Sequence, residues 1–341
     1  MKNFILKNEN AVYFESGFSC DNVVLLKCSN EMFFITDARY TIEAKEEVNK
    51  NVEVIESSDL IKTAKKIIKK NKIKKVIYDP YDFNVSDFNN LSQSLNTEFR
   101  AKINFSKQKR IIKTDKEINL LAIAAQFGRD GFDEFAKYIS KNGFNKTEKY
   151  LHFKAKQYMS NEGEFDLSFD PIVAINQNSA KPHALPSNKI LKSNDLLLVD
   201  AGIKYQRYCS DRTCTAVVNN KINFSREQKF KKNKHQKIYD IVLKAQQKAI
   251  SKARSGMRAS QIDKLTRDVI EKAGYGKYFV HSTGHGVGLD IHEYPNISAK
   301  SDVIIEDNMV FTIEPGIYLP DDFGVRIEDT VVMQNGKAVI L

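Results

Sequence analysis

The stretch His281-Ser-Thr-Gly-His285-Gly-Val-Gly-Leu-Asp-Ile-His292 holds three of the six histidines in this 341-residue chain. A lone histidine is usually structural, but three histidines placed so close together point to a functional site. The glycines at 284, 286 and 288 let the backbone approach another group closely. Their spacing departs from the GxGxxG phosphate loop and no β-α nucleotide unit frames them, so we favour a histidine site over a phosphate site.

The sequence outside this stretch contains a pair of carboxylates on either side of a predicted hairpin. Asp200 ends an apolar run and Asp211 precedes a β-prone run, and the midpoint between them falls between Tyr205 and Gln206. Two strands that pair symmetrically about this midpoint would place the two carboxylates opposite each other.

A second pair of carboxylates repeats this geometry. Glu314 and Glu328 each follow an apolar run, and their midpoint is Asp321. Asp321 lies inside the strong turn signal Pro320-Asp-Asp-Phe-Gly324. The turn predicts that Glu314 and Glu328 also face each other.

Four carboxylates that meet in one place repel each other unless cations neutralise them. Their four negative charges are balanced by two divalent cations, and a bridging hydroxide with one neutral imidazole would complete the coordination. Oxygen ligands with a single nitrogen suit Mn²⁺, with Co²⁺, Fe²⁺ and Zn²⁺ as alternatives. The sequence therefore predicts a centre of two divalent metal ions.

These residues resemble the metal ligands of the M24, or pita-bread, metallopeptidases. The Asp-Asp-His-Glu-Glu set of that family is matched in chain order by Asp200, Asp211, His285, Glu314 and Glu328. The surrounding motifs are similar as well, namely Leu198-Val-Asp-Ala-Gly202, Tyr208-Cys-Ser-Asp211, Gly284-His-Gly-Val-Gly288 and Thr312-Ile-Glu-Pro-Gly-Ile-Tyr318. The resemblance implies a metal-held hydroxide that attacks the scissile carbonyl while Glu314 moves protons.

Further residues resemble the proline-directed branch of this family. His183 lies in Pro182-His183-Ala184, downstream of Phe169-Asp-Pro-Ile-Val173. His281 and His292 stand on either side of the expected ligand His285, and Arg326 precedes Glu328 by two residues. The resemblance implies catalytic roles for His183, His281, His292 and Glu314, and substrate contacts for His183, His292 and Arg326.

The first part of the chain, residues 1–110, alternates short apolar runs with helical patterns, which predicts a small α/β domain. The apolar runs are Val23–Leu26, Phe33–Thr36, Val52–Ile55 and Lys75–Tyr78, and Leu60, Ala64, Ile67 and Ile68 have helical spacing. Through Tyr13 to Ser19 and Phe34-Ile-Thr-Asp-Ala-Arg39-Tyr40, the segment loosely resembles the N-terminal domain of creatinase and prolidase.

The second part opens at Thr114-Asp-Lys-Glu117, a capping box that predicts a long helix to about Lys141. Further helices are predicted over Thr147–Ser160, Arg226–Arg254 and Ala259–Ala273, with strands between and after them. We therefore expect an α/β N-terminal creatinase-like domain, residues 1–110, followed by an α+β pita-bread catalytic domain, residues 111–341.

The resemblance further implies a peptidase that cleaves the bond between an N-terminal residue and proline. Many prolidases have, four residues after the equivalent of His292, an arginine that pairs with the C-terminal carboxylate of a dipeptide. This chain has Asn296 there. We therefore expect an Xaa-Pro aminopeptidase (aminopeptidase P) ahead of an Xaa-Pro dipeptidase (prolidase), acting on small peptides and assembling as a homodimer. The alternatives are creatinase and a non-catalytic pita-bread binding module, and the complete metal set argues against both.

Two positions depart from the family pattern. Cys214 stands where many relatives have arginine in the sequence Asp-x-Thr-Arg-Thr. The lysine-rich stretch Lys229–Lys237 adds length before Ile238-Tyr-Asp-Ile-Val242. Neither change falls on a ligand position, so we expect hydrolysis to be retained.

Composition argues against several other classes of protein. No run approaches the roughly 18 apolar residues of a membrane span, and the stretch Met1 to Tyr13 lacks the apolar core of a signal peptide, which predicts a cytoplasmic protein without membrane contact. Four cysteines without a CxxC pair predict reduced thiols. The net charge of +10 comes from scattered lysines without interleaved aromatic residues, which is typical of a solvated surface and not of nucleic-acid binding.

Overall fold

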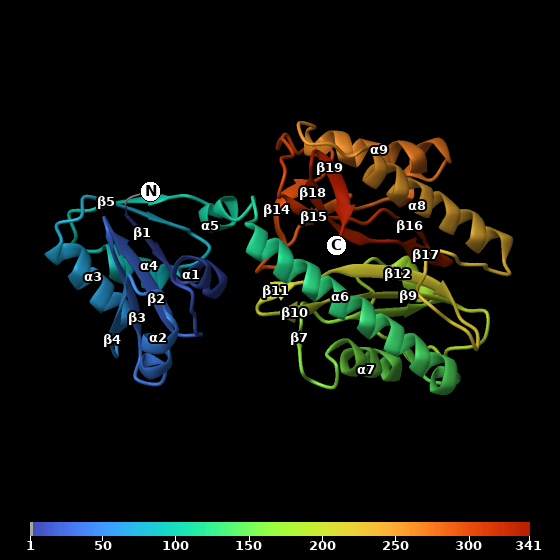
Figure 1. The fold of residues 1–341 in the computed structure, drawn as a ribbon, viewed down its shortest axis with the longest axis horizontal. Helices are drawn as coiled ribbons and strands as arrows, with labels where there is room; N and C mark the ends of the chain where they lie inside the picture. Colours follow the sequence, from blue (N-terminus) through green and yellow to red (C-terminus); the bar gives the residue numbers. More distant parts are fainter. Residues whose placement is uncertain (1–2) are drawn as a thin grey trace. The chain divides into compact units, whose positions relative to one another are not determined.

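The computed structural model describes residues 3–341 and divides into two compact units, one ending at Lys109 and the other beginning at Arg110 (Figure 1). Each unit has its own apolar core, so each is described by itself.

The first unit is a six-stranded mixed sheet with helices on both faces. Its strands are β1 (Asn3–Leu6), β2 (Val23–Cys28), β3 (Glu31–Thr36), β4 (Val52–Glu56), β5 (Lys75–Tyr78) and β6 (Glu98–Ala101), in the order β4-β3-β2-β1-β5-β6. Its helices are α1 (Glu9–Ser16), α2 (Thr41–Glu47), α3 (Leu60–Lys70), α4 (Val85–Ser92) and α5 (Phe105–Lys109).

Side chains alternate between the two faces of this sheet and fill one apolar cluster on each. Leu25 and Phe34 belong to one cluster, whereas Leu26 and Phe33 belong to the other. A strand that is covered on both sides reads as a continuous apolar run. This is why the four runs were recognisable in the sequence, and the predicted strands and the helix starting at Leu60 are confirmed.

Four long helices frame the second unit. They are α6 (Asp115–Tyr138), α7 (Glu148–Met159), α8 (Asn233–Lys252) and α9 (Ala259–Lys272), with short helical turns over Ile139–Gly143, Asn176–Ala180 and Gly276–Tyr278. The predicted capping box is confirmed, because the Glu117 N–H donates to Thr114 Oγ1 at 3.3 Å and the Thr114 N–H donates to Glu117 Oε2 at 2.8 Å.

Helix α8 begins later than the sequence predicted. The expected start was Arg226, but residues 226–232 form an irregular segment ahead of the helix. The cause is a contact with another segment. The Gln228 side chain accepts a hydrogen bond from the Val217 N–H at 3.0 Å, which holds residues 226–232 against the end of β12. A charged run with good helix formers was therefore overruled by a tertiary contact.

The strands of the second unit form small sheets between two helix pairs. They are β7 (Asp166–Leu167), β8 (Ile172–Ile175), β9 (Leu196–Ala201), β10 (Ile203–Tyr205), β11 (Tyr208–Cys209), β12 (Arg212–Val217), β13 (Gly284–Gly286), β14 (Glu293–Ile297), β15 (Val310–Ile313), β16 (Gly316–Leu319), β17 (Phe323–Arg326), β18 (Asp329–Gln334) and β19 (Lys337–Ile340). The sheet orders are β11-β10-β7, β12-β9-β8, β14-β13-β15-β18-β19 and β16-β17. Each half of the unit thus runs as two helices followed by strands.

Packing of the helices fixes which face of each strand looks inward. Val199 of β9 and Cys214 of β12 belong to the apolar cluster beneath α6 and α7. Because side chains alternate, Asp200 and Thr213 lie on the opposite face of the same two strands. Figure 1 shows α8 and α9 alongside the strands of the second half. The two halves therefore turn their polar strand faces toward the interior of the unit.

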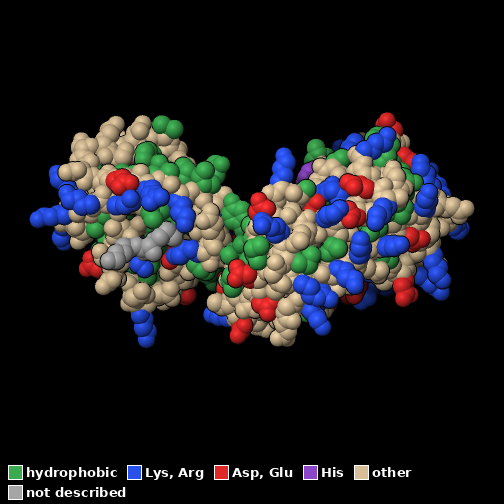
Figure 2. Space-filling model, turned by 90° about the horizontal axis from the view of Figure 1, so that it is seen from above, with side chains coloured by type: hydrophobic (Ala, Val, Ile, Leu, Met, Phe, Trp, Pro, Cys, Tyr) green, Lys and Arg blue, Asp and Glu red, His purple; other side chains and the backbone are tan. Residues whose placement is uncertain are grey.

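The surface carries charge of both signs. Figure 2 shows lysine and arginine side chains spread over the visible face, with aspartate and glutamate between them. All four cysteines are buried with unpaired thiols. Within residues 3–341, no helix is both long and apolar enough to cross a membrane.

Candidate metal centre

The first carboxylate hairpin does not have the predicted register. In the β9–β12 pair, Asp200 faces Thr213 and not Asp211. Asp211 lies two residues before Thr213, so it is the diagonal neighbour of Asp200 on the same face of the strands. The two carboxylates converge, but by a different pairing from the symmetric one expected.

The turn of this hairpin explains the difference. Tyr205 pairs with Tyr208, so the loop consists of Gln206 and Arg207. Both residues have positive φ, 46° and 72°, as in the tight two-residue hairpin turn that matches strand twist. The hairpin centre therefore lies one residue beyond the predicted midpoint, and no glycine or asparagine at the turn signalled it.

The second carboxylate hairpin has the predicted register. Ile313 pairs with Asp329 in one sheet and Gly316 pairs with Arg326 in the next, which keeps the hairpin symmetric about Asp321. Glu314 and Glu328 lie at the break between these two sheets. There the Glu314 N–H donates to Thr283 O at 2.8 Å and the Glu328 N–H donates to Thr213 O at 3.0 Å, which joins both halves of the unit at the centre.

The glycines around His285 allow β13 to lie very close to its neighbours. A Cβ atom at Gly284 would lie 1.9 Å from Thr312 O, and one at Gly286 would lie 2.1 Å from Tyr294 O. Residues 281–283 are fixed to α9, because buried Asp263 accepts hydrogen bonds from the Thr283 N–H and hydroxyl at 3.2 and 2.8 Å. The close approach inferred from the glycines is thus to neighbouring strands.

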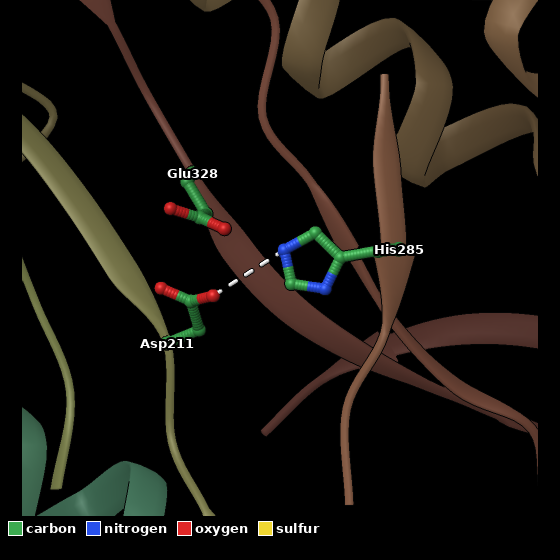
Figure 3. Close-up of side chains that lie close together, drawn as sticks. All are labelled: Asp211, His285 and Glu328. Carbon is green, nitrogen blue, oxygen red and sulfur yellow. Dashed lines mark ion pairs between the residues drawn. The ribbon is translucent and has the colours of Figure 1, made fainter. Parts of the chain in front are cut away.

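The side chains of Asp211, His285 and Glu328 meet at one point. One ligand atom from each lies within 4.8 Å of the others. Figure 3 shows the carboxylates of Glu328 and Asp211 one above the other, both beside a ring nitrogen of His285. His285 Nε2 is 3.5 Å from Asp211 Oδ2 and 3.4 Å from Glu314 Oε1. Asp200 lines the same cavity. The structure therefore brings all five predicted ligands together.

The electrostatics of this cluster call for cations. Burial raises the pKa of Glu314 to about 8, to which the charge of Asp200 also contributes. Burial, together with repulsion between neighbouring carboxylates, raises the pKa values of Asp211 and Glu328 well above their ordinary range. Asp200 Oδ1 and Glu328 Oε1 are buried with no hydrogen-bond partner. Unpartnered carboxylate oxygens that repel each other are suited to metal ions.

His285 presents the right nitrogen to a metal. Its Nδ1 lies 3.1 Å from Gly286 O, a carbonyl that only accepts, so the ring proton sits on Nδ1. Nε2 then turns its lone pair toward the carboxylates. Burial lowers the pKa of His285 to about 4, which keeps the ring neutral and able to bind a cation.

A chain of hydrogen bonds extends from Asp200 to His281. Arg326 Nη2 donates to Asp200 Oδ2 at 2.7 Å and Nη1 donates to Tyr318 Oη at 2.8 Å. Tyr318 Oη lies 2.8 Å from His281 Nε2, and His281 Nδ1 lies 2.7 Å from Ser282 O. Because the Ser282 carbonyl only accepts, Nδ1 of His281 carries the ring proton. Nε2 therefore accepts a hydrogen bond from the Tyr318 hydroxyl.

The centre opens into a cavity of about 640 Å³. His183 and His292 line it, and the His292 ring lies 4.3 Å from the His285 ring, centroid to centroid. Much of the remaining wall is apolar, formed by Phe169, Pro171, Ile172, Ala184 and Leu185. The further residues that the sequence predicted for the site, His183, His281, His292 and Arg326, thus line the same cavity as the predicted metal ligands.

Sequence reasoning missed the roles of Thr213 and Tyr318. The Thr213 hydroxyl donates to Glu328 Oε2 at 2.6 Å and accepts from Arg326 Nε at 3.0 Å. Tyr318 connects Arg326 with His281. Alternation along the β-prone run after Asp211 places Thr213 on the carboxylate face, and this signal could have identified it.

Comparison with known proteins agrees with this geometry. Residues 119–335 match metallopeptidase family M24, and residues 1–114 match the creatinase/prolidase N-terminal domain. An Xaa-Pro dipeptidase of Pyrococcus horikoshii is 35% identical over 337 residues, 98% of this chain and 90% of the relative.

Two solved structures share the whole fold. An Xaa-Pro dipeptidase from Bacillus anthracis superposes with a TM-score of 0.90 and 33% identity, covering 99% of this chain and 92% of that one. An X-Pro aminopeptidase from Thermotoga maritima gives a TM-score of 0.87 and 32% identity, covering 100% of this chain and 95% of that one. The chain therefore belongs to metallopeptidase family M24, with a creatinase-type N-terminal domain before the pita-bread catalytic domain, and is a peptide-hydrolysing enzyme.

Proposed function

We propose that this peptidase hydrolyses the bond between an N-terminal residue and proline, using two divalent cations held by Asp200, Asp211, His285, Glu314 and Glu328. The observation that carries the proposal is the convergence of four carboxylates and one neutral imidazole, with two buried carboxylate oxygens left unpartnered. The complete set of ligands gives no support to a non-catalytic binding module.

When bound, the two ions supply the positive charge that activates water and polarises the scissile carbonyl. Mn²⁺ is the metal we propose, because four of the five donors are carboxylates and none is a thiolate. Glu314 is the residue we propose to move protons, because it lies in the buried cluster 3.4 Å from His285 Nε2 and accepts a hydrogen bond from the Thr312 hydroxyl at 3.2 Å.

The three outer histidines take different roles in this proposal. Both ring nitrogens of His281 are already engaged, by Ser282 O and by the Tyr318 hydroxyl. We therefore assign His281 the task of orienting Tyr318 and, through it, Arg326. His183 and His292 line the cavity and are the donors proposed for the carbonyl oxygen of the substrate as it becomes negatively charged.

Proline preference follows from the character of the wall. The nitrogen of the scissile bond belongs to the proline ring and offers no N–H, so hydrogen bonding to it cannot select the substrate. An apolar slot can select the ring by shape, and the side chains of Phe169, Pro171 and Ile172 provide such a surface.

Two peptide lengths have support. The Xaa-Pro dipeptidases among the relatives favour a dipeptide substrate. One observation favours a longer peptide: Arg326 is the only lysine or arginine among the described residues that line the cavity, and each of its three side-chain nitrogens already donates a hydrogen bond. Asn296, also in the wall, offers an amide and no charge to a C-terminal carboxylate. The sequence led us to expect the aminopeptidase first; with the names of the relatives in its support, we now propose the dipeptidase first and keep the aminopeptidase second on account of this wall.

The test compares kcat/KM for an Xaa-Pro dipeptide with that for the matching Xaa-Pro-Yaa tripeptide in the presence of Mn²⁺. A dipeptide preference above about tenfold would assign a prolidase, and a tripeptide preference would assign an aminopeptidase P. Exhaustive chelation should remove both activities and Mn²⁺ should restore them. Turnover that survives chelation, or no cleavage of either peptide, would overturn the proposal.

The family resemblance also leads us to propose a cytoplasmic homodimer. Light scattering on the purified protein measures the assembly, and a monomer mass at micromolar concentration would contradict the dimer.

A further inference from the structure

Arg226 contacts Glu328 without lining the cavity of the metal site, and it lines a separate pocket together with Gln246 and Asp329. It lies in the irregular segment between β12 and α8, and the Tyr239 hydroxyl holds its backbone by donating to Arg226 O at 3.2 Å. Its guanidinium donates from Nη2 to the backbone carbonyl of Glu328 at 2.7 Å. The same nitrogen lies 2.6 Å from Asp329 Oδ1. One side chain therefore contacts two successive residues, the proposed metal ligand Glu328 and its neighbour Asp329.

The contact with Arg226 matters for Glu328 because Glu328 is not paired in a strand ladder. The ladder of the second hairpin is interrupted between the Gly316–Arg326 pair and the Ile313–Asp329 pair, and Glu328 lies in the gap. Its N–H and one carboxylate oxygen are bound to Thr213. Its carbonyl is bound by Arg226, so the three contacts together fix the direction in which the carboxylate points.

The position of the guanidinium relates to a departure noted in the sequence. Arg226 Nη1 lies 3.8 Å from the sulfur of Cys214, the buried residue at which the family resemblance led us to expect arginine. Cysteine is short, and the guanidinium of Arg226 occupies the space next to its sulfur. A longer side chain at position 214 would enter the same space.

We propose that Arg226 is a positioning residue for Glu328, and that it supplies from another segment the guanidinium that an arginine at position 214 would otherwise supply. The inference rests on the proposed metal site, but its main readout is metal binding and not turnover. Partners that orient metal ligands typically contribute about 10–100-fold to metal affinity or activity.

Asp329 keeps one hydrogen bond and one ion pair if Arg226 is removed. Gln246 Nε2 donates to Asp329 Oδ2 at 2.6 Å, and Arg212 Nε lies 3.9 Å from Asp329 Oδ1. Loss of Arg226 should therefore affect the direction of Glu328 more than the folding of the unit. Lysine replaces the arginine only in part, because both contacts come from Nη2 at the end of a rigid planar guanidinium, whereas an ammonium group on a flexible stem is not held in that position.

The experiment compares wild type with Arg226→Ala, Arg226→Lys, the double variant Cys214→Arg/Arg226→Ala, and Lys229→Ala as a control in the same segment. Lys229 is exposed, so its replacement should change nothing. The measurements are Mn²⁺ affinity by competition titration, the melting temperature of the metal-free protein, and kcat and KM for an Xaa-Pro peptide.

We expect Arg226→Ala to bind Mn²⁺ about 10–100-fold more weakly and to lower kcat with KM changed less than about threefold. Arg226→Lys should recover part of the affinity, and the double variant should recover most of it. Affinity within about twofold of wild type in Arg226→Ala would overturn the inference. So would a weakened Arg226→Ala that the arginine at position 214 fails to rescue, because the loss would then be structural. A wild-type protein that binds Mn²⁺ but cleaves no Xaa-Pro peptide would refute the proposed function, and the Mn²⁺ affinities would still decide the role of Arg226.

Discussion

The two carboxylate hairpins each supply two of the proposed metal ligands, but they differ in how far their geometry can be predicted from the sequence. The hairpin of Glu314 and Glu328 is symmetric about Asp321, as its turn signal predicts. The hairpin of Asp200 and Asp211 is displaced, so that Asp200 faces Thr213. Proline, aspartate and glycine mark the turn between Glu314 and Glu328, whereas the turn between Asp200 and Asp211 is made by Gln206 and Arg207.

The displaced hairpin still delivers both ligands because side chains on a strand alternate with a period of two. A shift of two residues in the pairing keeps every side chain on its original face, whereas a shift of one would turn Asp211 away from Asp200. Convergence of the ligands is therefore more robust than the register. The comparison teaches that the convergence of four carboxylates can be predicted from two hairpins even where one pairing is wrong.

The largest effect should come from removing one ligand from each hairpin. We predict that Asp211→Asn and Glu328→Gln each reduce kcat/KM by at least about a hundredfold. Replacing a residue that only hydrogen-bonds to a metal ligand typically lowers metal affinity or activity by about 10–100-fold, so replacing a ligand should lower it more. If the hairpins contribute equally to one centre, the two losses should be similar.

The amide variants keep the shape of the side chain and remove one repelling charge. The melting temperature of each metal-free variant should therefore equal or exceed that of the wild type. Asp322→Asn, in the turn of the second hairpin, is the control and should retain full activity. Activity within about tenfold of wild type in either amide variant would place the metal elsewhere.

The imidazole contributed between the hairpins gives the next contrast. His285→Ala should lose both metal and turnover, since His285 Nε2 lies 3.5 Å from Asp211 and 3.4 Å from Glu314. His292→Ala should lose at least about tenfold in kcat while keeping its metal, because His292 is expected to contact the substrate. Elemental analysis of the two purified variants decides the matter, and metal retained by His285→Ala but lost by His292→Ala would reverse the assignment.

How much of this site could be predicted depends on the range of the interactions that determine it. Local motifs predicted that the five proposed ligands and the histidines His183, His281 and His292 would lie together, and they also predicted the register of the hairpin of Glu314 and Glu328. The start of α8 was wrong because Gln228 binds the distant Val217 N–H, and the register of the first hairpin was wrong because its turn residues adopt positive φ without glycine. The contacts of Arg226 with Glu328 and Cys214 join segments that have no recognisable pairing signal in the sequence.

A smaller effect concerns the stability of the metal-free protein between pH 6.5 and 8. Burial raises the pKa of Glu314 to about 8 in the folded state, compared with an ordinary value near 4.3. In this window the folded state holds a proton that the unfolded state has released, so stability falls as pH rises. The buried His281 and His285, whose pKa values burial lowers to about 4, act in the opposite direction at the lower end of this window, because the unfolded chain binds protons at its histidines near pH 6.5. Asp211 and Glu328, whose pKa values are raised like that of Glu314, add to the fall in stability.

We therefore expect the melting temperature of the metal-free protein to fall by about 2 °C or more from pH 6.5 to 8, since about 1 kcal/mol corresponds to roughly 2–4 °C in a domain of this size. With Mn²⁺ the trend should reverse, because metal binding displaces the protons and strengthens with pH. Thermal melts with and without Mn²⁺ measure both slopes. A metal-free protein that gains stability over this window would contradict the repulsion inferred among the carboxylates.

The smallest expected effect concerns the backbone strain in the turn of each hairpin. Gln206 has a φ of 46° in a two-residue hairpin loop where asparagine is strongly preferred, and its side chain is exposed. Asp321 has a φ of 61° after Pro320, in a turn closed by the Asp322 N–H donating to Leu319 O at 3.1 Å. An ordinary residue pays about 1–2 kcal/mol in the left-handed region, whereas asparagine and aspartate tolerate it.

The same replacement should therefore act differently at the two sites. Gln206→Asn should raise the free energy of unfolding by about 0.5 kcal/mol, or roughly 1–2 °C in melting temperature. Asp321→Asn should change it by less, because aspartate already tolerates this conformation. Neither residue lines the cavity, so kcat/KM should be unchanged in both. Stabilisation by Asp321→Asn but not by Gln206→Asn would mean that backbone strain at the turn is not what distinguishes the hairpins, and the displaced register would then have to come from the pairing of β9 with β12, where Thr213 opposes Asp200 and binds Glu328.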